Sequence, residues 1–315
     1  MKKKPIIILT GPTAVGKTKA SIGLAKSIGG EIISADCMQV YQKMDIGSAK
    51  IHPEEREGIR HYLINVLDPA EEFNVVLFQQ MAKQAMDKIY ANGHIPIVVG
   101  GTGFYIQALL YDVDFTQEED DKGIRAELET IAKEKGAEYL HHMLQEIDAK
   151  SAETIHANNV KRVVRAIEYY RQTGQPISEH NEKERQKESP YNFAYFVLLD
   201  ERQRLYERIE KRIDLMMEEG LLNEVKTLYE EGYTRDMVSM QGLGYKEILD
   251  YLDGKMTLDE AIYILKRDTR HFAKRQITWF KREKDVCWID KSAFQYDEDK
   301  ILAEMLNILK TKEIL

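Results

Sequence analysis

A glycine-rich segment near the start of the chain has the residue types and spacing to hold a polyphosphate. The run Gly11, Pro12, Thr13, Ala14, Val15, Gly16, Lys17, Thr18 fits G-x-x-x-x-G-K-[ST] and directly follows the apolar run Ile6–Thr10. In such a loop between a strand and a helix, backbone N–H groups and the helix N-terminus bind the phosphates, while the lysine neutralises their charge. The sequence therefore predicts a diphosphate-binding loop over residues 11–18, with Thr18 as the Mg²⁺ ligand.

Two further segments are expected at the same place. Asp36 follows the predicted strand Glu31–Ala35, and the turn Gly100-Gly101-Thr102-Gly103 follows the predicted strand Ile95–Val99. Ligands of parallel sheets bind at the carboxyl ends of the strands, so Asp36 and Thr102 should lie beside the phosphate loop. Asp36 could bind Mg²⁺ or act as a general base toward an acceptor, to which Thr102 could hydrogen-bond. The structural alternative for Asp36 is capping of the next helix.

Basic residues are concentrated late in the chain. Between Lys266 and Lys284 there are eight Lys or Arg residues and two acidic ones, although the whole chain has a net charge of −8. Helical spacing places one stripe of side chains on a single face: Arg267, Arg270, Lys274, Thr278 and Lys281. A local basic face on an acidic protein fits a nucleic-acid footprint. Its alternative is a solvated basic helix without a partner.

Three arginines elsewhere could also meet phosphates. Arg162 and Arg165 are three residues apart on a predicted helix, where they could clamp a phosphate or grip a nucleic-acid backbone. Arg212 could reach the diphosphate from a core helix, or it could be a surface ion-pair partner.

The elements that must position these residues follow an α/β pattern. Strands are predicted at Ile6–Thr10, Glu31–Ala35, Tyr62–Val66, Ile95–Val99, Ala194–Leu199 and Val286–Ile289, and the first helices at Lys17–Ile28 and Val75–Asn92. This alternation predicts a mostly parallel sheet. Residues 115–190 are charged and helical by period, with Asn181–Ser189 as a return linker. We therefore predict a core domain of residues 1–114 and 191–315 and a helical insertion of residues 115–190.

Composition sets limits on the class of protein. Hydrophobic residues make up 43% and charged residues 31%, as in a soluble globular enzyme. No apolar run approaches the ~18 residues of a membrane span, so no membrane partner is expected. The two cysteines, Cys37 and Cys287, are too far apart in sequence for a C-x-x-C pair, which excludes a zinc finger and a disulfide framework and favours a reducing cytoplasm.

These segments, in this order, resemble the tRNA dimethylallyltransferase (tRNA isopentenyltransferase) family of the bacterial type, nearly end to end. The matching blocks are residues 11–18, 34–36, 39–41, 44–50, 61–63, 100–105, 162–168, 242–247 and 274–280. The resemblance implies transfer of a dimethylallyl group from dimethylallyl diphosphate to the exocyclic amine of the adenosine 3′ to the anticodon. The tRNAs would be those reading codons that begin with U, and diphosphate would be released.

The resemblance also implies a fold and residue roles. The fold is a P-loop nucleotide-kinase-like core, with Mg²⁺ as cofactor and the tRNA anticodon stem-loop as partner; we expect a monomer. Asp36 is implied as the general base, and Thr18, Lys17 and Arg212 as the groups acting on the diphosphate. The implied tRNA contacts are Asp36, Cys37, Met38, Gln39, Thr102, Arg125, Lys161, Arg162, Val163, Val164, Arg165, Gln241, Gly242, Leu243, Gly244, Tyr245 and Lys246. Cys37 stands where the family usually has serine.

Two other functions fit parts of the sequence. A small-molecule kinase would use the phosphate loop, Asp36 as base, and Arg162 and Arg165 as a lid. A nucleotide-switched RNA-binding protein would use the loop and the basic stripe without catalysis. The strand before Gly100 carries no Asp or Glu for a second metal-binding motif, which counts against an ATP-hydrolysing motor.

Overall fold

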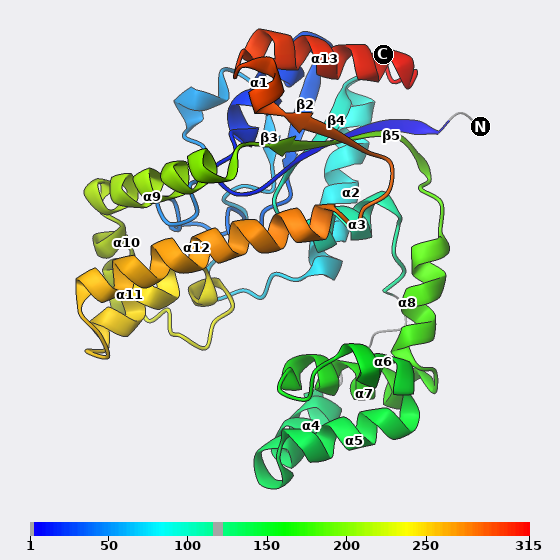
Figure 1. Ribbon diagram of the computed structural model, residues 1–315, viewed down its shortest axis with the longest axis vertical. Helices are drawn as coiled ribbons and strands as arrows, with labels where there is room; N and C mark the ends of the chain where they lie inside the picture. Colours follow the sequence, from blue (N-terminus) through cyan, green and yellow to red (C-terminus); the bar gives the residue numbers. More distant parts are fainter. Residues whose placement is uncertain (1–2, 116–121) are drawn as a thin grey trace. The chain divides into compact units, whose positions relative to one another are not determined.

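The larger part of the chain is built on a sheet of parallel strands (Figure 1). The structure, a computed structural model, describes residues 3–115 and 122–315. Six strands form the sheet in the order β3-β2-β4-β1-β5-β6. Their bounds are β1 (Lys4–Thr10), β2 (Gly30–Ser34), β3 (His61–Tyr62), β4 (Ile95–Gly100), β5 (Tyr191–Leu199) and β6 (Val286–Asp290). Every pair is parallel, which confirms the predicted fold class.

Strand β1 lies in the interior of this sheet, between β4 and β5. Residues Ile6–Leu9 have no exposed surface. A strand that is covered on both faces has a continuous run of apolar residues. This is why β1 could be predicted from the sequence. Thr10 pairs with Gly100 on one side and Val197 on the other, so the segments that follow β1 and β4 start next to each other.

The direction in which successive connections cross the sheet changes at these two neighbouring parallel strands. From β1 the chain runs through α1 (Lys17–Ile28) to β2 on one side, whereas from β4 it leads toward β5 on the other. Loops that diverge in this way leave a crevice between them at the carboxyl ends of the strands. Right-handed crossovers place α1 and α2 (Val75–Ala91) on opposite faces, and α1 lies with α13 (Glu298–Thr311) on one side (Figure 1).

Five further helices, of eight to 23 residues, belong to the same compact unit as the sheet. They are α3 (Gly103–Leu110), α9 (Arg202–Glu219), α10 (Leu221–Glu230), α11 (Tyr245–Leu252) and α12 (Leu258–Phe280), with short 3₁₀ turns at Pro53–Arg56, Ser239–Gln241 and Lys291–Phe294. Helix α12 begins with a capping box in which Thr257 and Glu260 bind each other's backbone N–H groups. It packs against α9, α11 and α3, so one helix reaches several parts of the core.

The helical insertion has a core of its own. It comprises α4 (Lys122–Lys135), α5 (Ala137–Ile147), α6 (Ala149–Thr154), α7 (Val160–Thr173) and α8 (Ile177–Gln186). Leu128, Leu140, Leu144 and Ile167 are buried together at its centre. Contacts divide the chain into residues 1–110 with 190–315 and residues 111–189, close to the boundaries that we predicted.

Most predicted strand bounds agree with the structure to within three residues, but two predicted elements differ further. Strand β3 ends at Tyr62 instead of Val66, because Leu63 and Asn65 adopt left-handed backbone angles that no strand accommodates. The predicted linker at 181–189 is mostly helix α8, which runs to Gln186. None of its residues is fully buried, so its charged composition reflects solvent exposure and not the lack of a helix. Within the described ranges, no helix combines the length and apolarity needed to cross a membrane.

Candidate active site

The phosphate loop occupies the turn between β1 and α1, as predicted. Gly11 and Gly16 have φ angles of 145° and 101°, which favour glycine. A Cβ atom on Gly11 would lie 2.5 Å from the carbonyl oxygen of Leu198, so the loop also needs glycine there for space. Helix α1 begins at Lys17, directly after the second glycine. The first-turn N–H groups of α1 are therefore available to an anion.

Cationic side chains hold the carbonyl oxygens of this loop. Lys17 Nζ donates to the carbonyls of Gly11 (3.0 Å) and Pro12 (2.9 Å). Arg208 Nε donates to the carbonyl of Ala14 at 2.8 Å, and the buried Lys291 Nζ lies 3.5 Å from that of Val15. Positive charge thus surrounds the loop, which favours an anionic ligand.

Arg212 and Asp36 complete the charged cluster around Lys17. Arg212 donates a hydrogen bond to the Thr13 hydroxyl. Burial, and then the charge of Arg212, lowers the pKa of Lys17 to about 8, while Asp36 opposes this shift. Burial also lowers the pKa of Arg212, with Asp36 again acting in the opposite direction. The structure therefore brings together Lys17, Arg212 and Asp36, which are far apart in the sequence.

Asp36 also shapes the turn that follows β2. Its Oδ1 accepts hydrogen bonds from the backbone N–H groups of Met38 (2.8 Å) and Gln39 (3.4 Å). This is the capping alternative, except that the residues after Asp36 form a turn and not a helix. Both bonds use Oδ1, so capping does not occupy Oδ2. A role as a base and a role in the turn are compatible.

Thr102 and Cys37 lie side by side at the start of α3. The Thr102 N–H donates to the carbonyl of Ala35 at 3.3 Å, and its hydroxyl hydrogen-bonds the Cys37 thiol. Burial raises the pKa of Cys37 to about 12, so this thiol stays neutral. A Cβ atom on Gly100 would lie 2.1 Å from the carbonyl oxygen of Ala35, which requires glycine at this close approach.

Gln276 joins the two glycine loops, a role that sequence reasoning missed. Its Oε1 accepts from the N–H of Thr13 (2.8 Å) and its Nε2 donates to the carbonyl of Gly101 (3.0 Å). Gln276 is buried on α12. The only signal in the sequence is a polar residue at an apolar position of the helical pattern.

The segment from Gln241 to Lys246 packs against the turn after Asp36. A Cβ atom on Gly242 would lie 2.4 Å from Met38 Cε, so Gly242 and Met38 are in contact. Gln241 is exposed and Leu243 is half-buried. Gly244 has a φ angle of 94° and precedes α11. Lys246 forms an ion pair with Glu247 (3.4 Å).

In the insertion, two of the three implied arginines share one buried carboxylate. Arg125 and Arg165 donate to Glu168 Oε2 at 2.8 and 3.2 Å. Lys161 and Arg162 are exposed on α7. These two side chains are therefore accessible to a nucleic acid.

Three implied tRNA contacts need correction. The side chains of Val163 and Val164 are buried in the core of the insertion, and that of Tyr245 is buried beside Gly47. Fully enclosed side chains give tRNA no surface to touch, so the side chains of these three residues have structural roles.

The predicted basic stripe lies on α12 and just beyond it. Arg267 pairs with Asp268 and Arg270 with Glu210, whereas Lys274, Thr278 and Lys281 are exposed. In the described part of the chain, no group of three or more His, Cys, Asp or Glu side chains could hold a metal ion.

Comparisons with known proteins agree on one family. Residues 39–283 match the family model described as IPP transferase. The chain is 60% identical over 312 residues to the tRNA dimethylallyltransferase of Lachnoclostridium phytofermentans, covering 99% of both chains. The crystal structure of the full-length tRNA isopentenylpyrophosphate transferase from Bacillus halodurans matches with a TM-score of 0.74 and 44% identity, over 99% of this chain and 98% of that one.

A third match comes from a structure of a eukaryotic dimethylallyltransferase acting on tRNA. It has a TM-score of 0.85 at 31% identity and covers 99% of this chain and 79% of that chain. Because the family model matches most of the chain and the identity to a relative is high over nearly the whole length, this chain belongs to the IPP transferase family.

Proposed function

We propose that this protein is a tRNA dimethylallyltransferase. It transfers the dimethylallyl group of dimethylallyl diphosphate to the exocyclic amine of the adenosine 3′ to the anticodon, in tRNAs that read codons beginning with U. The observation that carries this proposal is the cluster of Lys17, Arg212 and Asp36 beside the phosphate loop. It combines cations for a leaving diphosphate with a carboxylate for an acceptor, in a chain similar to enzymes of that name.

The cations of this cluster assist the leaving group. As the carbon–oxygen bond of the donor breaks, its electron pair goes to the diphosphate, and negative charge grows there. Lys17, Arg212 and the N–H groups at the start of α1 stabilise that charge. The effect is strong because burial reduces screening by water, and the same burial lowers the pKa of both side chains.

Thr18 fits a magnesium site that depends on the substrate. Its side chain is exposed in the first turn of α1, directly after Lys17. Mg²⁺ keeps several waters and uses one or two protein oxygens together with phosphates, so a single hydroxyl is a suitable protein contribution. When bound, the ion neutralises charge on the diphosphate.

Asp36 acts on the acceptor. The lone pair of an adenine amine is delocalised into the ring, which makes it a poor nucleophile. Asp36 takes the amine proton as the new carbon–nitrogen bond forms, so charge does not build up on nitrogen. Its Oδ1 is held by the turn at Met38 and Gln39, which fixes the carboxylate before substrate arrives.

The anticodon stem-loop binds through exposed basic residues. Lys161 and Arg162 of the insertion and Lys274 of α12 are free to meet phosphates. Turning the adenosine out of its stack costs a few kcal/mol in general, and less in a single-stranded loop than in a duplex. Phosphate contacts offset that cost. We infer that the protein works as a monomer in the cytoplasm, where its tRNA substrate is found.

Replacement of Asp36 tests this proposal. With labelled dimethylallyl diphosphate and unmodified tRNA, the wild-type protein should label the adenosine 3′ to the anticodon. Asp36→Asn keeps the shape of the side chain and should bind tRNA normally, while its transfer rate falls by about 10²- to 10⁴-fold. Asp259→Asn, an exposed acid on α12, is the matched control and should keep the full rate.

Two results would refute the proposal. One is normal transfer by Asp36→Asn, which removes Asp36 from the mechanism. The other is phosphorylation that depends on ATP and needs no allyl donor, as the kinase alternative requires.

A further inference from the structure

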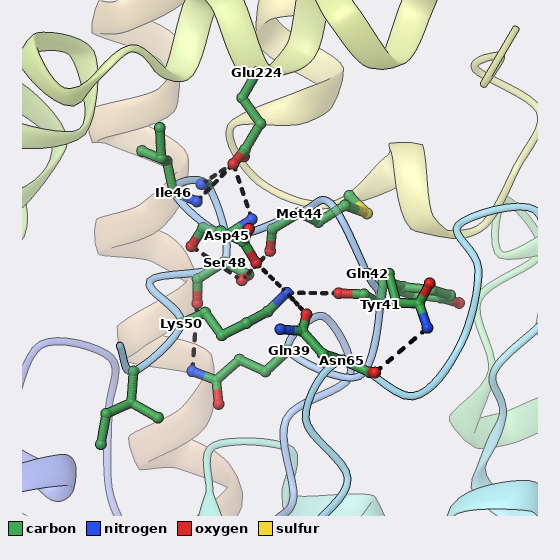
Figure 2. A network of polar contacts seen from close by, with 12 residues as sticks. Gln39, Tyr41, Gln42, Met44, Asp45, Ile46, Ser48, Lys50, Asn65 and Glu224 are labelled. Carbon is green, nitrogen blue, oxygen red and sulfur yellow. Dashed lines mark hydrogen bonds and ion pairs between the residues drawn. The ribbon is translucent and has the colours of Figure 1, made fainter. Parts of the chain in front are cut away.

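A joint of polar contacts connects the segment after Asp36 to helix α10 (Figure 2) and, through Tyr245, to α11. Its centre is Glu224, in the first turn of α10. The Glu224 carboxylate accepts hydrogen bonds from three successive backbone N–H groups, those of Asp45 (2.9 Å), Ile46 (2.8 Å) and Gly47 (3.0 Å). The Tyr245 hydroxyl donates to the same carboxylate at 2.8 Å. Successive N–H groups of this kind form a concave site for an anion, here filled by a side chain.

The fourth donor shows how tightly this joint is built. A Cβ atom on Gly47 would lie 2.6 Å from the ring of Tyr245, so the ring lies directly against the backbone that Glu224 binds. Tyr245 is fully buried and belongs to the segment that packs on Met38 through Gly242. Glu224 therefore ties three segments at one point: residues 45–47, α10 and the start of α11.

Lys50 anchors the other end of the 45–47 segment (Figure 2). Its Nζ donates to the carbonyl of Tyr41 (2.6 Å), to Asp45 Oδ1 (2.7 Å) and to Asn65 Oδ1 (2.5 Å). The side chain is 3% exposed, so all three donors of the ammonium group are used inside the protein. Asp45 thus connects the two charged residues: its N–H binds Glu224 and its side chain binds Lys50.

Gln39 links this joint to Asp36. The Gln39 side chain donates to the carbonyl of Ala49 (3.2 Å) and accepts from the Ser34 hydroxyl (3.1 Å), while its backbone N–H lies 3.4 Å from Asp36 Oδ1. A continuous path of hydrogen bonds and short chain segments therefore runs from Glu224 to the carboxylate of Asp36. Glu224 itself makes no contact with the phosphate loop among the described hydrogen bonds.

We propose that Glu224 is a positioning residue for Asp36 in the transfer reaction, acting through residues 45–47 and Gln39; this rests on the proposed function. Without the Glu224 carboxylate, three backbone N–H groups lose their acceptor, and the segment that holds Gln39 loses its fixed position. Displacement of a catalytic group by about 1 Å can slow a reaction by up to about 100-fold. The phosphate loop is held by other residues, so binding of the allyl donor should not change.

The test is a kinetic comparison of Glu224→Gln with Glu230→Gln. Glutamine keeps the size of the side chain, but it lacks the charge and turns an NH₂ group toward the donors. We expect kcat of Glu224→Gln to fall by about 10- to 100-fold with KM for the donor unchanged. Glu230 lies on the same helix in an exposed pair with Lys226, and its variant should match the wild type.

A double-mutant cycle separates positioning from a general structural role. If Glu224 acts through Asp36, adding Glu224→Gln to Asp36→Asn should slow transfer no further, because the group being positioned is already lost. Multiplied losses in the double variant would overturn the proposal, and so would a wild-type kcat in Glu224→Gln. Should that variant not fold, Tyr245→Phe removes one donor at constant ring volume and should show a smaller loss in kcat with the same lack of additivity. Additive behaviour of Tyr245→Phe would equally overturn it.

Failure of this proposal is distinguishable from failure of the proposed function. A wild-type protein that transfers no label to tRNA refutes the function itself. A wild-type protein that transfers normally, alongside a Glu224→Gln variant of equal kcat, refutes only the role of Glu224.

Discussion

Lys17 lies in surroundings that oppose its own charge. Burial is the main cause and the guanidinium of Arg212 the second, and together they lower the pKa of Lys17 to about 8. The carboxylate of Asp36 acts in the opposite direction but does not cancel them. A bound diphosphate would add negative charge beside Lys17 and favour the protonated form. In the free protein, by contrast, Lys17 loses its proton within the range of ordinary assays.

Donor capture should therefore depend on pH. Below about pH 8 Lys17 is an ammonium group and binds diphosphate, whereas above it the neutral amine does not, so kcat/KM for the donor should decline as pH rises through 8. At saturating donor, kcat should stay level over the same range. In Lys17→Arg the decline should disappear, whatever the absolute rate, because arginine stays protonated. A wild-type kcat/KM that stays level up to the ordinary pKa of lysine would contradict this reading.

At the scale of the elements, the glycine turn after β4 is a tightly packed junction. Gly100 approaches the backbone of Ala35 at the end of β2, Gly101 approaches Gln276, and Gly103 lies against the ring of Trp279. The end of β2 and helix α12 thus both close on this turn, and neither leaves room for a side chain there. The turn fixes α12 relative to the sheet, because Gln276 also binds the phosphate loop.

A methyl group added at this turn should lower the stability of the protein. In Gly100→Ala the new Cβ atom would lie 2.1 Å from a carbonyl oxygen, so the backbone must shift. We expect the free energy of unfolding to fall by about 1–3 kcal/mol, measured by denaturant titration. Gly23→Ala is the matched control: Gly23 is inside α1 with its nearest neighbour at 3.8 Å, and the change should stabilise the protein by about 0.5–1 kcal/mol. Equal stability of both variants would contradict the packing described for the turn.

Helices and strands could be predicted from the sequence more accurately than the side-chain contacts between them. Helix α1 was predicted with its observed bounds, because glycines stand at both ends and apolar residues recur at helical spacing. The end of β3 was not predicted: asparagine tolerates a left-handed backbone, but the type of Leu63, directly after the last strand residue, gives no such signal. Glu224 and Gln276 could not be assigned either. Their backbone partners are more than 170 residues away, and only the folded chain brings such groups together.

At the scale of the whole molecule, groups of exposed basic residues occur on a protein whose net charge is negative. The chain carries a net charge of −8. Exposed cations are nevertheless found in both compact units, with Lys161 and Arg162 in the insertion and Lys274 and Arg275 on α12. Acidic surface elsewhere would repel the tRNA phosphates. We therefore expect tRNA to approach where these exposed Lys and Arg side chains lie.

Salt should weaken tRNA binding steeply, because each phosphate contact releases counterions. Arg162→Gln and Lys274→Gln should each weaken binding and reduce the slope of log affinity against log salt by about 1. Binding of the allyl donor to the loop should respond less. Lys88→Gln, an exposed lysine on α2, is the control and should leave the slope unchanged. A salt response that is flat in the wild type would mean that these cations are not the footprint.

The order of strands in the sheet also bears on synthesis of the chain by the ribosome. Strand β1 is made first, but its neighbours β4 and β5 begin at residues 95 and 191. Until then its apolar side chains lack a permanent cover, and pairing over such distances is slow. The loop after β1 remains incomplete for longer, because its partners Arg208, Arg212, Gln276 and Lys291 are all translated after β5. Nascent chains that stop before residue 291 should thus have an incomplete cradle for the donor, and stalled translation should yield protein that captures it poorly.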